Sequence, residues 1–141
     1  MTTRTLVAFA FLVLGAGCRS NSSPQPGTAP KGVVVWKTVG SWSGRGSRQT
    51  ETFTSDTGGF RVRWETKIAA WPGAGHLHVI FRSGDSGREI IDAVDVRGEG
   101  RGTEEVSAER PRWYYLTIDS ADVDWTLAVD ERIDARVTGS P

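Results

Sequence analysis

Two histidines in one short stretch are the first side chains of this sequence that could do chemistry. His76 and His78 are separated by one residue, so a β-strand would place both imidazoles on one face, roughly 7 Å apart. Such a pair binds zinc or copper when further ligands complete the site, and carboxylates would have to supply them here. The alternative is two histidines on the polar face of a strand.

Three acidic residues near a predicted turn offer a different metal chemistry. Asp119, Asp122 and Asp124 supply oxygen ligands of the kind that calcium prefers, and the last two would share a strand face. The spacing of an EF-hand is absent, and the competing explanation is a solvated turn with aspartate caps. We therefore expect no bound cofactor, with calcium at these aspartates as the alternative.

No stretch of the sequence has the residues of a catalytic site. The GDSG loop at residues 84–87 resembles the nucleophile loop of chymotrypsin-like proteases, but both histidines lie only ten and eight residues before Ser86, whereas a triad joins distant segments. The two Gly-Arg-Gly turns lack the Lys and Ser/Thr of a P-loop. We therefore expect a protein that is not an enzyme.

An outward-facing aromatic pair is the candidate binding patch. Trp113 and Tyr115 lie in an alternating stretch, on the face opposite to its apolar core residues. Arg112 adds a guanidinium beside them, and this combination could stack on sugar rings or anchor a protein partner. If the patch is not a site, we expect the C-terminal segment around Ile133 and Val137 to cover it.

The N-terminus has the layout of an export signal. Arg4 precedes nine apolar residues, LVAFAFLVL, which are followed by small residues and by Cys18, the only cysteine. The apolar run is too short to span a bilayer, which takes about 20 residues. The stretch LGAGC resembles the lipobox of bacterial lipoproteins, in which the cysteine is acylated and becomes the new N-terminus. The alternative is an ordinary signal peptide with an incidental cysteine.

The lipobox resemblance implies three segments. Residues 1–17 would be the signal peptide, and palmitate on Cys18 would anchor the chain in a membrane of the cell envelope, facing away from the cytoplasm. Residues 18–32, rich in Ser, Pro and Gly, predict a flexible tether. Removing the signal peptide removes one Arg, which leaves 16 basic and 17 acidic side chains. This nearly neutral balance gives no strong electrostatic field that would attract nucleic acid.

Residues 33–141 predict one all-β domain. About eight short alternating stretches are separated by Gly, Asp or Pro turns, and no helical pattern occurs; they cover residues 33–39, 49–55, 60–68, 76–82, 88–96, 103–108, 113–118 and 123–129. This pattern is typical of an antiparallel sandwich with jelly-roll or Greek-key connections. Residues 88–96, apolar on both faces, predict a central or bulged strand. Residues 131–141 predict one more edge strand or a frayed end.

The alternation also predicts the core. Phe60, Val62 and Trp64 would face inward, with Arg61 and Arg63 on the opposite face. The stretch at 123–129 would place its own tryptophan, at position 125, in the core. The two halves of the chain, at 42–65 and 97–119, repeat a pattern of turn, short polar strand and aromatic strand, as a double Greek key would.

Several pieces together resemble a known type of domain. They are Trp42 with the GRG turn at 44–46, FRVRW at 60–64, the Gly-rich turn at 98–102, WYYL at 113–116 and WTLAV at 125–129. They resemble small secreted or lipid-anchored prokaryotic β-sandwich domains, whose shape is similar to CUB-like and pre-peptidase C-terminal domains. The resemblance implies a fold and an accessory role, and no activity.

These observations predict a lipid-anchored protein of the cell envelope with a non-catalytic binding or structural module. Its expected partners are the membrane, through the N-terminal lipid, and an envelope protein or a glycan that the sequence does not identify. Two alternatives remain: a carbohydrate-binding or enzyme-accessory domain, and a calcium-binding sandwich.

Overall fold

The computed structural model describes residues 32–68, 71, 73–108 and 113–135. These residues form nine strands: β1 (Val33–Arg45), β2 (Arg48–Gln49), β3 (Phe53–Thr54), β4 (Gly59–Ile68), β5 (His76–Ser83), β6 (Glu89–Arg97), β7 (Gly100–Ser107), β8 (Trp113–Ala121) and β9 (Val123–Ala135). The described part of the chain has no helix that could cross a membrane.

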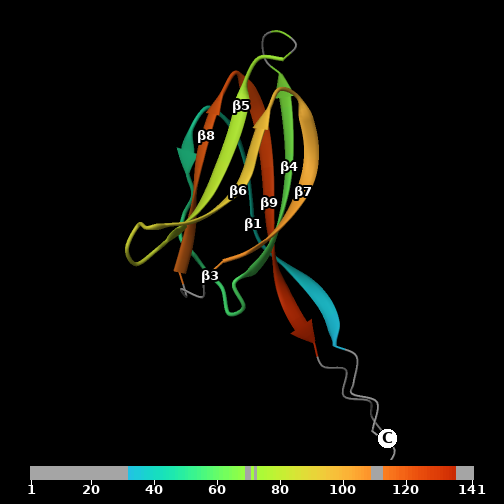
Figure 1. Cartoon of the computed structure of the whole chain (residues 1–141), viewed down its shortest axis with the longest axis vertical. Coiled ribbons are helices and arrows are strands. Elements are labelled where there is room, and N and C mark those ends of the chain that lie inside the picture. Colours follow the sequence, from blue (N-terminus) through green and yellow to red (C-terminus); the bar gives the residue numbers. More distant parts are fainter. Residues whose placement is uncertain (1–31, 69–70, 72, 109–112, 136–141) are drawn as a thin grey trace, which may run out of the picture.

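The strands form two antiparallel sheets that pack on one another (Figure 1). Sheet A has the order β1-β9-β4-β7; sheet B has the order β2-β8-β5-β6, with β3 also paired to β8. The chain behaves as one long hairpin centred on the β5–β6 turn, because β4 pairs with β7, β2 and β3 pair with β8, and β1 pairs with β9. Rolling up this hairpin gives a jelly roll, and the predicted all-β sandwich is confirmed.

Alternating side chains build both layers. In β5 and β8 every second residue is buried, since successive side chains of a strand point to opposite faces. At the centre of the core, the rings of Phe53, Phe60, Phe81 and Tyr114 contact one another, with centroids 4.8 to 6.3 Å apart. Phe60 comes from sheet A and the other three from sheet B or its β3 extension, so this cluster joins the layers.

Two tryptophans of the predicted core differ in their environments. Trp125 is buried, and its Nε1 donates a hydrogen bond to the carbonyl of Gly46 at 2.9 Å. Trp64 is half-buried and packs against the edge of the core, beside β7. The ring lies so close to the backbone of Gly102 that a Cβ there would be 2.7 Å from Cζ2 of Trp64. Position 102 therefore has to be glycine.

The strands differ from the sequence prediction at two places. β6 is an edge strand rather than a central one, and its apolar residues on both faces reflect two register shifts against β5, so the predicted bulge is present. The tail expected to fray or form a separate strand instead continues β9 to Ala135, paired with the start of β1. The reason is that β1 is long enough to supply partners along this whole length.

Candidate functional site

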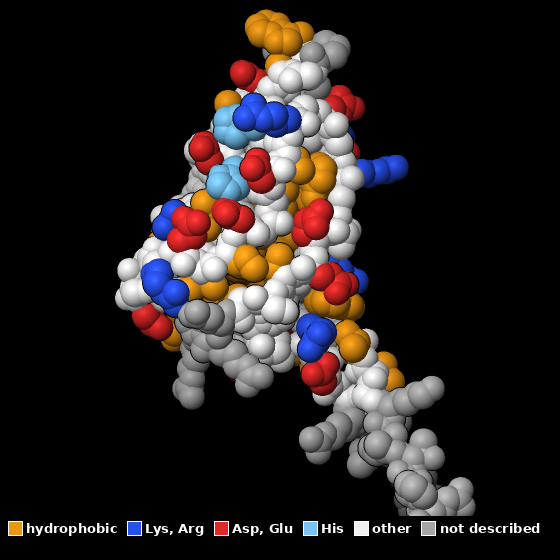
Figure 2. Space-filling view, in the orientation of Figure 1, with side chains coloured by type: hydrophobic (Ala, Val, Ile, Leu, Met, Phe, Trp, Pro, Cys, Tyr) orange, Lys and Arg blue, Asp and Glu red, His pale blue; other side chains and the backbone are white. Residues whose placement is uncertain are grey.

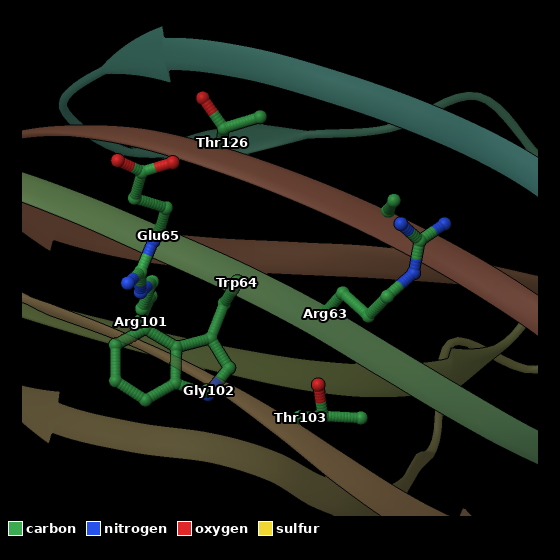
Figure 3. Close-up of a pocket in the computed structure, with 8 residues that line it drawn as sticks. Arg63, Trp64, Glu65, Arg101, Gly102, Thr103 and Thr126 are labelled. Atoms are coloured by element: carbon green, nitrogen blue, oxygen red, sulfur yellow. The ribbon is translucent and has the colours of Figure 1, made fainter.

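A hollow of about 330 Å³ lies on the outer face of sheet A, over strands β9, β4 and β7 (Figure 3). Two cross-strand rows of side chains line it: Arg101, Glu65 and Thr126 form one row, and Thr103, Arg63 and Ala128 form the next. Short side chains on β9 beside long ones on β4 leave the depression. Figure 3 shows Arg63 at one end and Glu65 with Arg101 at the other.

A buried carboxylate fixes Arg63 at its end of the hollow. Nε and Nη2 of Arg63 each donate a hydrogen bond to Asp130 at 3.1 Å. Arg61 donates to the same carboxylate at 3.0 and 2.7 Å, and the hydroxyl of Thr38 donates at 2.8 Å. Asp130 is only 2% exposed, whereas the side chain of Arg63 is 50% exposed. Arg63 therefore keeps N–H groups available to a ligand while its position is held.

The electrostatics of this cluster keep Asp130 ionised. Burial by itself raises the pKa of Asp130, but the hydrogen bonds from Arg63, Arg61 and Thr38 outweigh it and lower the pKa to about 2. One carboxylate thus faces two guanidinium groups. Asp130, Arg61 and Arg63 together therefore carry a net positive charge, and Arg63 places part of it at the end of the hollow.

Trp36 extends this cluster toward the first residues of β1. The guanidinium carbon of Arg61 lies 4.6 Å from the centre of the Trp36 ring, within the range of a cation–π contact. Arg61 is therefore held from two sides, and it positions Asp130 for Arg63.

The side chains that line the hollow supply hydrogen-bond donors suited to anionic and hydroxyl-bearing groups. Within the described residues, Arg101 has no ion-pair or hydrogen-bond partner, so its guanidinium is available. Paired N–H donors of guanidinium groups recognise carboxylates and phosphates, and the threonine hydroxyls can hydrogen-bond to a polyol. Glu65 is the one carboxylate among the lining residues.

Glu131, the neighbour of Asp130, has a structural role on the opposite face. Its Oε1 accepts hydrogen bonds from the hydroxyls of Ser55 and Thr57 and from the backbone N–H groups of Asp56 and Thr57, at 2.6 to 3.2 Å. Burial raises the pKa of Glu131, but these donors outweigh it and lower the pKa. The carboxylate therefore fixes the loop between β3 and β4.

The two histidines lie on the outer face of sheet B, on one side of β5 as predicted (Figure 2). Nε2 of His78 lies 2.8 Å from Oδ1 of Asp92 on β6, and Nε2 of His76 lies 3.8 Å from Oδ1 of Asp119 on β8. Figure 2 shows the pair among acidic side chains. Each imidazole thus has its own carboxylate, and the described residues contain no group of three ligands that could hold a metal ion.

The three aspartates of the predicted turn do not converge. Asp119 accepts a hydrogen bond from the hydroxyl of Ser47 at 2.7 Å, and Asp124 is paired with Arg45 at 2.7 and 2.9 Å. These hydrogen bonds lower the pKa of both carboxyl groups. Asp122 occupies the turn between β8 and β9 with a φ of 57°, which aspartate tolerates better than most residues.

The two aromatic residues of the predicted patch share the outer face of β8 but have different surroundings. Trp113 is 48% exposed and forms part of the wall of a second hollow, of about 350 Å³, between the middle of β1 and β3. Tyr115 is half-buried next to the β5–β6 turn, where a Cβ at Gly87 would lie 3.5 Å from its hydroxyl. Ile133 pairs with Val35 in sheet A. Arg112, Val137 and the lipidation candidate Cys18 lie outside the described residues.

The hollow on sheet A is a feature that the sequence did not single out. Alternation placed Arg63 and Glu65 on the outward face, but their neighbours Arg101, Thr126 and Ala128 come from strands far away in the chain. The only local signal is that Arg61 and Arg63 occupy alternate positions. Two guanidinium groups on one strand face need an acidic partner nearby.

Comparison with known proteins adds no relative: no family model matches the chain, and no curated protein is similar to it. The likeness to lipid-anchored β-sandwich domains therefore stays a prediction from the sequence motifs.

Proposed function

We propose that this protein is a lipid-anchored protein of the cell envelope whose jelly-roll domain is a non-catalytic binding module for an acidic glycan. The anchor is supported by the sequence alone, through the apolar run that ends in LGAGC at Cys18. Two or more acyl chains hold a protein stably on a membrane, whereas one holds it marginally.

The observation that carries the binding role is the guanidinium of Arg63, which Asp130 holds at the end of the hollow. A preorganised donor loses less conformational freedom when a ligand binds. Arg101, in the other row, supplies a second cation. Two cations that flank short, hydroxyl-bearing side chains suit a ligand with both acidic groups and hydroxyls. A glycan chain with carboxylate or phosphate groups has this chemistry.

A glycan array tests this role. The full lipidated chain, purified in detergent micelles, is applied to uronate-containing, phosphorylated and neutral oligosaccharides. We expect binding to the acidic oligosaccharides, and the two acidic sets distinguish carboxylate from phosphate recognition. Replacing Arg63 by Gln removes a charged donor worth about 1.5–3 kcal/mol, so affinity should fall by about tenfold or more.

Arg45→Gln is the matched control. Arg45 lies on the same sheet and is also paired with an aspartate, but it does not line the hollow. Its replacement should leave glycan affinity unchanged. Equal binding of neutral and acidic oligosaccharides would contradict the proposal, and so would equal losses in the Arg63 and Arg45 variants. If Trp113→Ala abolishes binding while Arg63→Gln does not, the second hollow is the site.

A further inference from the structure

The first residues of β1 and the last residues of β9 leave the sandwich as a two-stranded ribbon. Val33, Val34, Val35 and Trp36 pair with Ala135, Asp134, Ile133 and Arg132 in that order. Figure 1 shows this ribbon extending away from the body of the domain, beyond the region of β3. The ribbon is therefore the end of the domain that continues directly from the segment after Cys18.

One face of the ribbon is wholly apolar. It consists of Val33, Val35, Ile133 and Ala135, since directly paired residues share a face and alternate residues repeat it. Farther along β9 the same face carries core residues such as Leu127 and Val129. In the ribbon, by contrast, Val33 and Val35 are 47% and 46% exposed. The paired Lys37 and Glu131 lie between these core residues and the apolar residues of the ribbon on this face, which extends past the point where sheet B covers sheet A.

The opposite face is mixed. Val34 is 50% exposed there, beside the half-buried ring of Trp36, which lies under the guanidinium of Arg61. Arg132 and Asp134 form an ion pair at 3.6 Å on the same face. The ribbon therefore has an apolar side and a side that can remain in water, and the second side carries the aromatic ring and the cations.

We infer that the tip of this ribbon enters the interfacial layer of the membrane to which the chain is anchored. The inference rests on the proposed lipid anchor. Val33 follows Cys18 by fifteen positions, and a coil of that length spans roughly 20 Å. A lipid on Cys18 therefore keeps the exposed valines within reach of the bilayer. A short apolar surface beside a lipid anchor provides the second membrane signal that stable attachment uses.

A bilayer fits this surface better than a second copy of the chain does. A specific protein interface buries roughly 800 Å² on each partner, and four partly exposed side chains of Val, Ile and Ala offer far less. Shallow insertion needs no such area, because the lipid anchor already holds the protein at the membrane. Sheet B packs on the same side as the apolar face, so the domain stands on its ribbon instead of lying flat.

This orientation places the hollow above the membrane. Ala128 in the hollow precedes Ala135 at the ribbon end by seven residues of β9, which at about 3.3 Å per residue spans roughly 23 Å. Glycan chains beside the membrane could thus reach Arg63 without contact with the lipid headgroups.

Spin labelling tests the inference directly. Acylation consumes the thiol of the only cysteine, so Val33→Cys, on the apolar face, introduces one free thiol for a nitroxide. The lipidated full chain is placed in vesicles of phosphatidylethanolamine and phosphatidylglycerol. We expect the label at 33 to collide several-fold more often with oxygen, which concentrates in lipid, than with a water-soluble nickel complex. Ser43→Cys is the matched control, because Ser43 is exposed on the same strand, and its label should show the reverse preference.

A second variant and a mass measurement separate the outcomes. Adding Val35→Asp to the labelled chain should return the label at 33 to water without changing the melting temperature, because Val35 is exposed. A label at 33 as accessible to nickel as the label at 43 would overturn the inference. Spin–spin broadening at 33 that vanishes on dilution with unlabelled protein would assign the ribbon to a second copy and also overturn it. The mass of the Cys18 peptide tests the anchor separately from both results.

Discussion

Arg63 and Asp130 form a two-point contact in which Nε and Nη2 of the arginine donate to the two oxygens of the aspartate, each at 3.1 Å. A buried carboxylate costs several kcal/mol of desolvation unless charges and hydrogen bonds compensate it. Five hydrogen bonds from Arg63, Arg61 and Thr38 do so here. The contact therefore stabilises the strand pairing and orients a cation at the hollow.

The low pKa of Asp130 predicts a loss of stability in acid. The pKa is about 2 in the folded chain, against an ordinary value of 3.8, so the fold favours the ionised form. This contribution is complete above about pH 4 and is lost as the pH falls through about 2. At about 1.36 kcal/mol per pKa unit it amounts to about 2 kcal/mol.

Urea unfolding of the wild-type chain and of Asp130→Asn, compared near neutral pH and near pH 2, measures this contribution. The variant should be less stable by about 2 kcal/mol or more at neutral pH, and the difference should shrink toward zero in acid. A difference that does not change with pH would show that the charge of Asp130 is not what stabilises the fold.

Glu131→Gln should loosen the loop between β3 and β4. The carboxylate Oε1 accepts four hydrogen bonds from Ser55, Asp56 and Thr57, and hydrogen bonds to a charged group contribute about 1.5–3 kcal/mol. Hydrogen exchange at the amides of Asp56 and Thr57 should become faster, and the free energy of unfolding should fall by about 1–3 kcal/mol. Glu104→Gln, at an exposed position on β7, is the control that should leave both values unchanged.

The glycines beside Trp64 give a prediction with a built-in comparison. A Cβ at Gly102 would lie 2.7 to 2.9 Å from three atoms of the Trp64 ring, whereas a Cβ at Gly100 would lie 3.5 Å away, in ordinary contact. Gly102→Ala should therefore destabilise the fold by about 1–3 kcal/mol, the usual cost of overpacking. Gly100→Ala should be neutral or slightly stabilising. Equal effects in chemical denaturation would mean that the ring does not sit over Gly102.

The fold could be predicted from the sequence because the alternation of apolar and polar residues is a local property of each strand. Phe60 and Val62 are buried as predicted, and so are Trp125 and its neighbours on the same face of β9. The burial of Asp130 was not foreseen. Asp130 lies between the predicted strand at 123–129 and the predicted tail at 131–141, and its burial depends on a register that sets it opposite Thr38 and Arg61, each far away in the chain.

The hollow was missed for the same reason. A depression arises where short side chains lie beside long ones in adjacent strands, and periodicity within one strand does not report the neighbour. Thr126 and Ala128 are unremarkable in sequence; only their pairing with Glu65 and Arg63 opens space. The aromatic patch shows the converse, because Trp113 and Tyr115 share a strand face but have different surroundings.

The two aromatic residues should therefore respond differently to truncation. Trp113→Ala should shift the melting temperature little, because the residue is 48% exposed and surface changes are usually within about 0.5 kcal/mol. Tyr115→Ala should lower it more, since Tyr115 packs beside the β5–β6 turn. A large drop for Trp113→Ala would make this ring part of the core and remove it as a candidate for binding.

The intact mass of the mature chain, purified from a bacterial membrane fraction, tests the lipid anchor on which the proposed function depends. We predict a chain that begins at Cys18 and carries the added mass of a diacylglyceryl group, with further mass if the new amino terminus is also acylated. Metabolic labelling with palmitate should mark this chain and should fail for Cys18→Ser. A wild-type chain without lipid mass, or one that begins at a residue other than Cys18, would contradict the account.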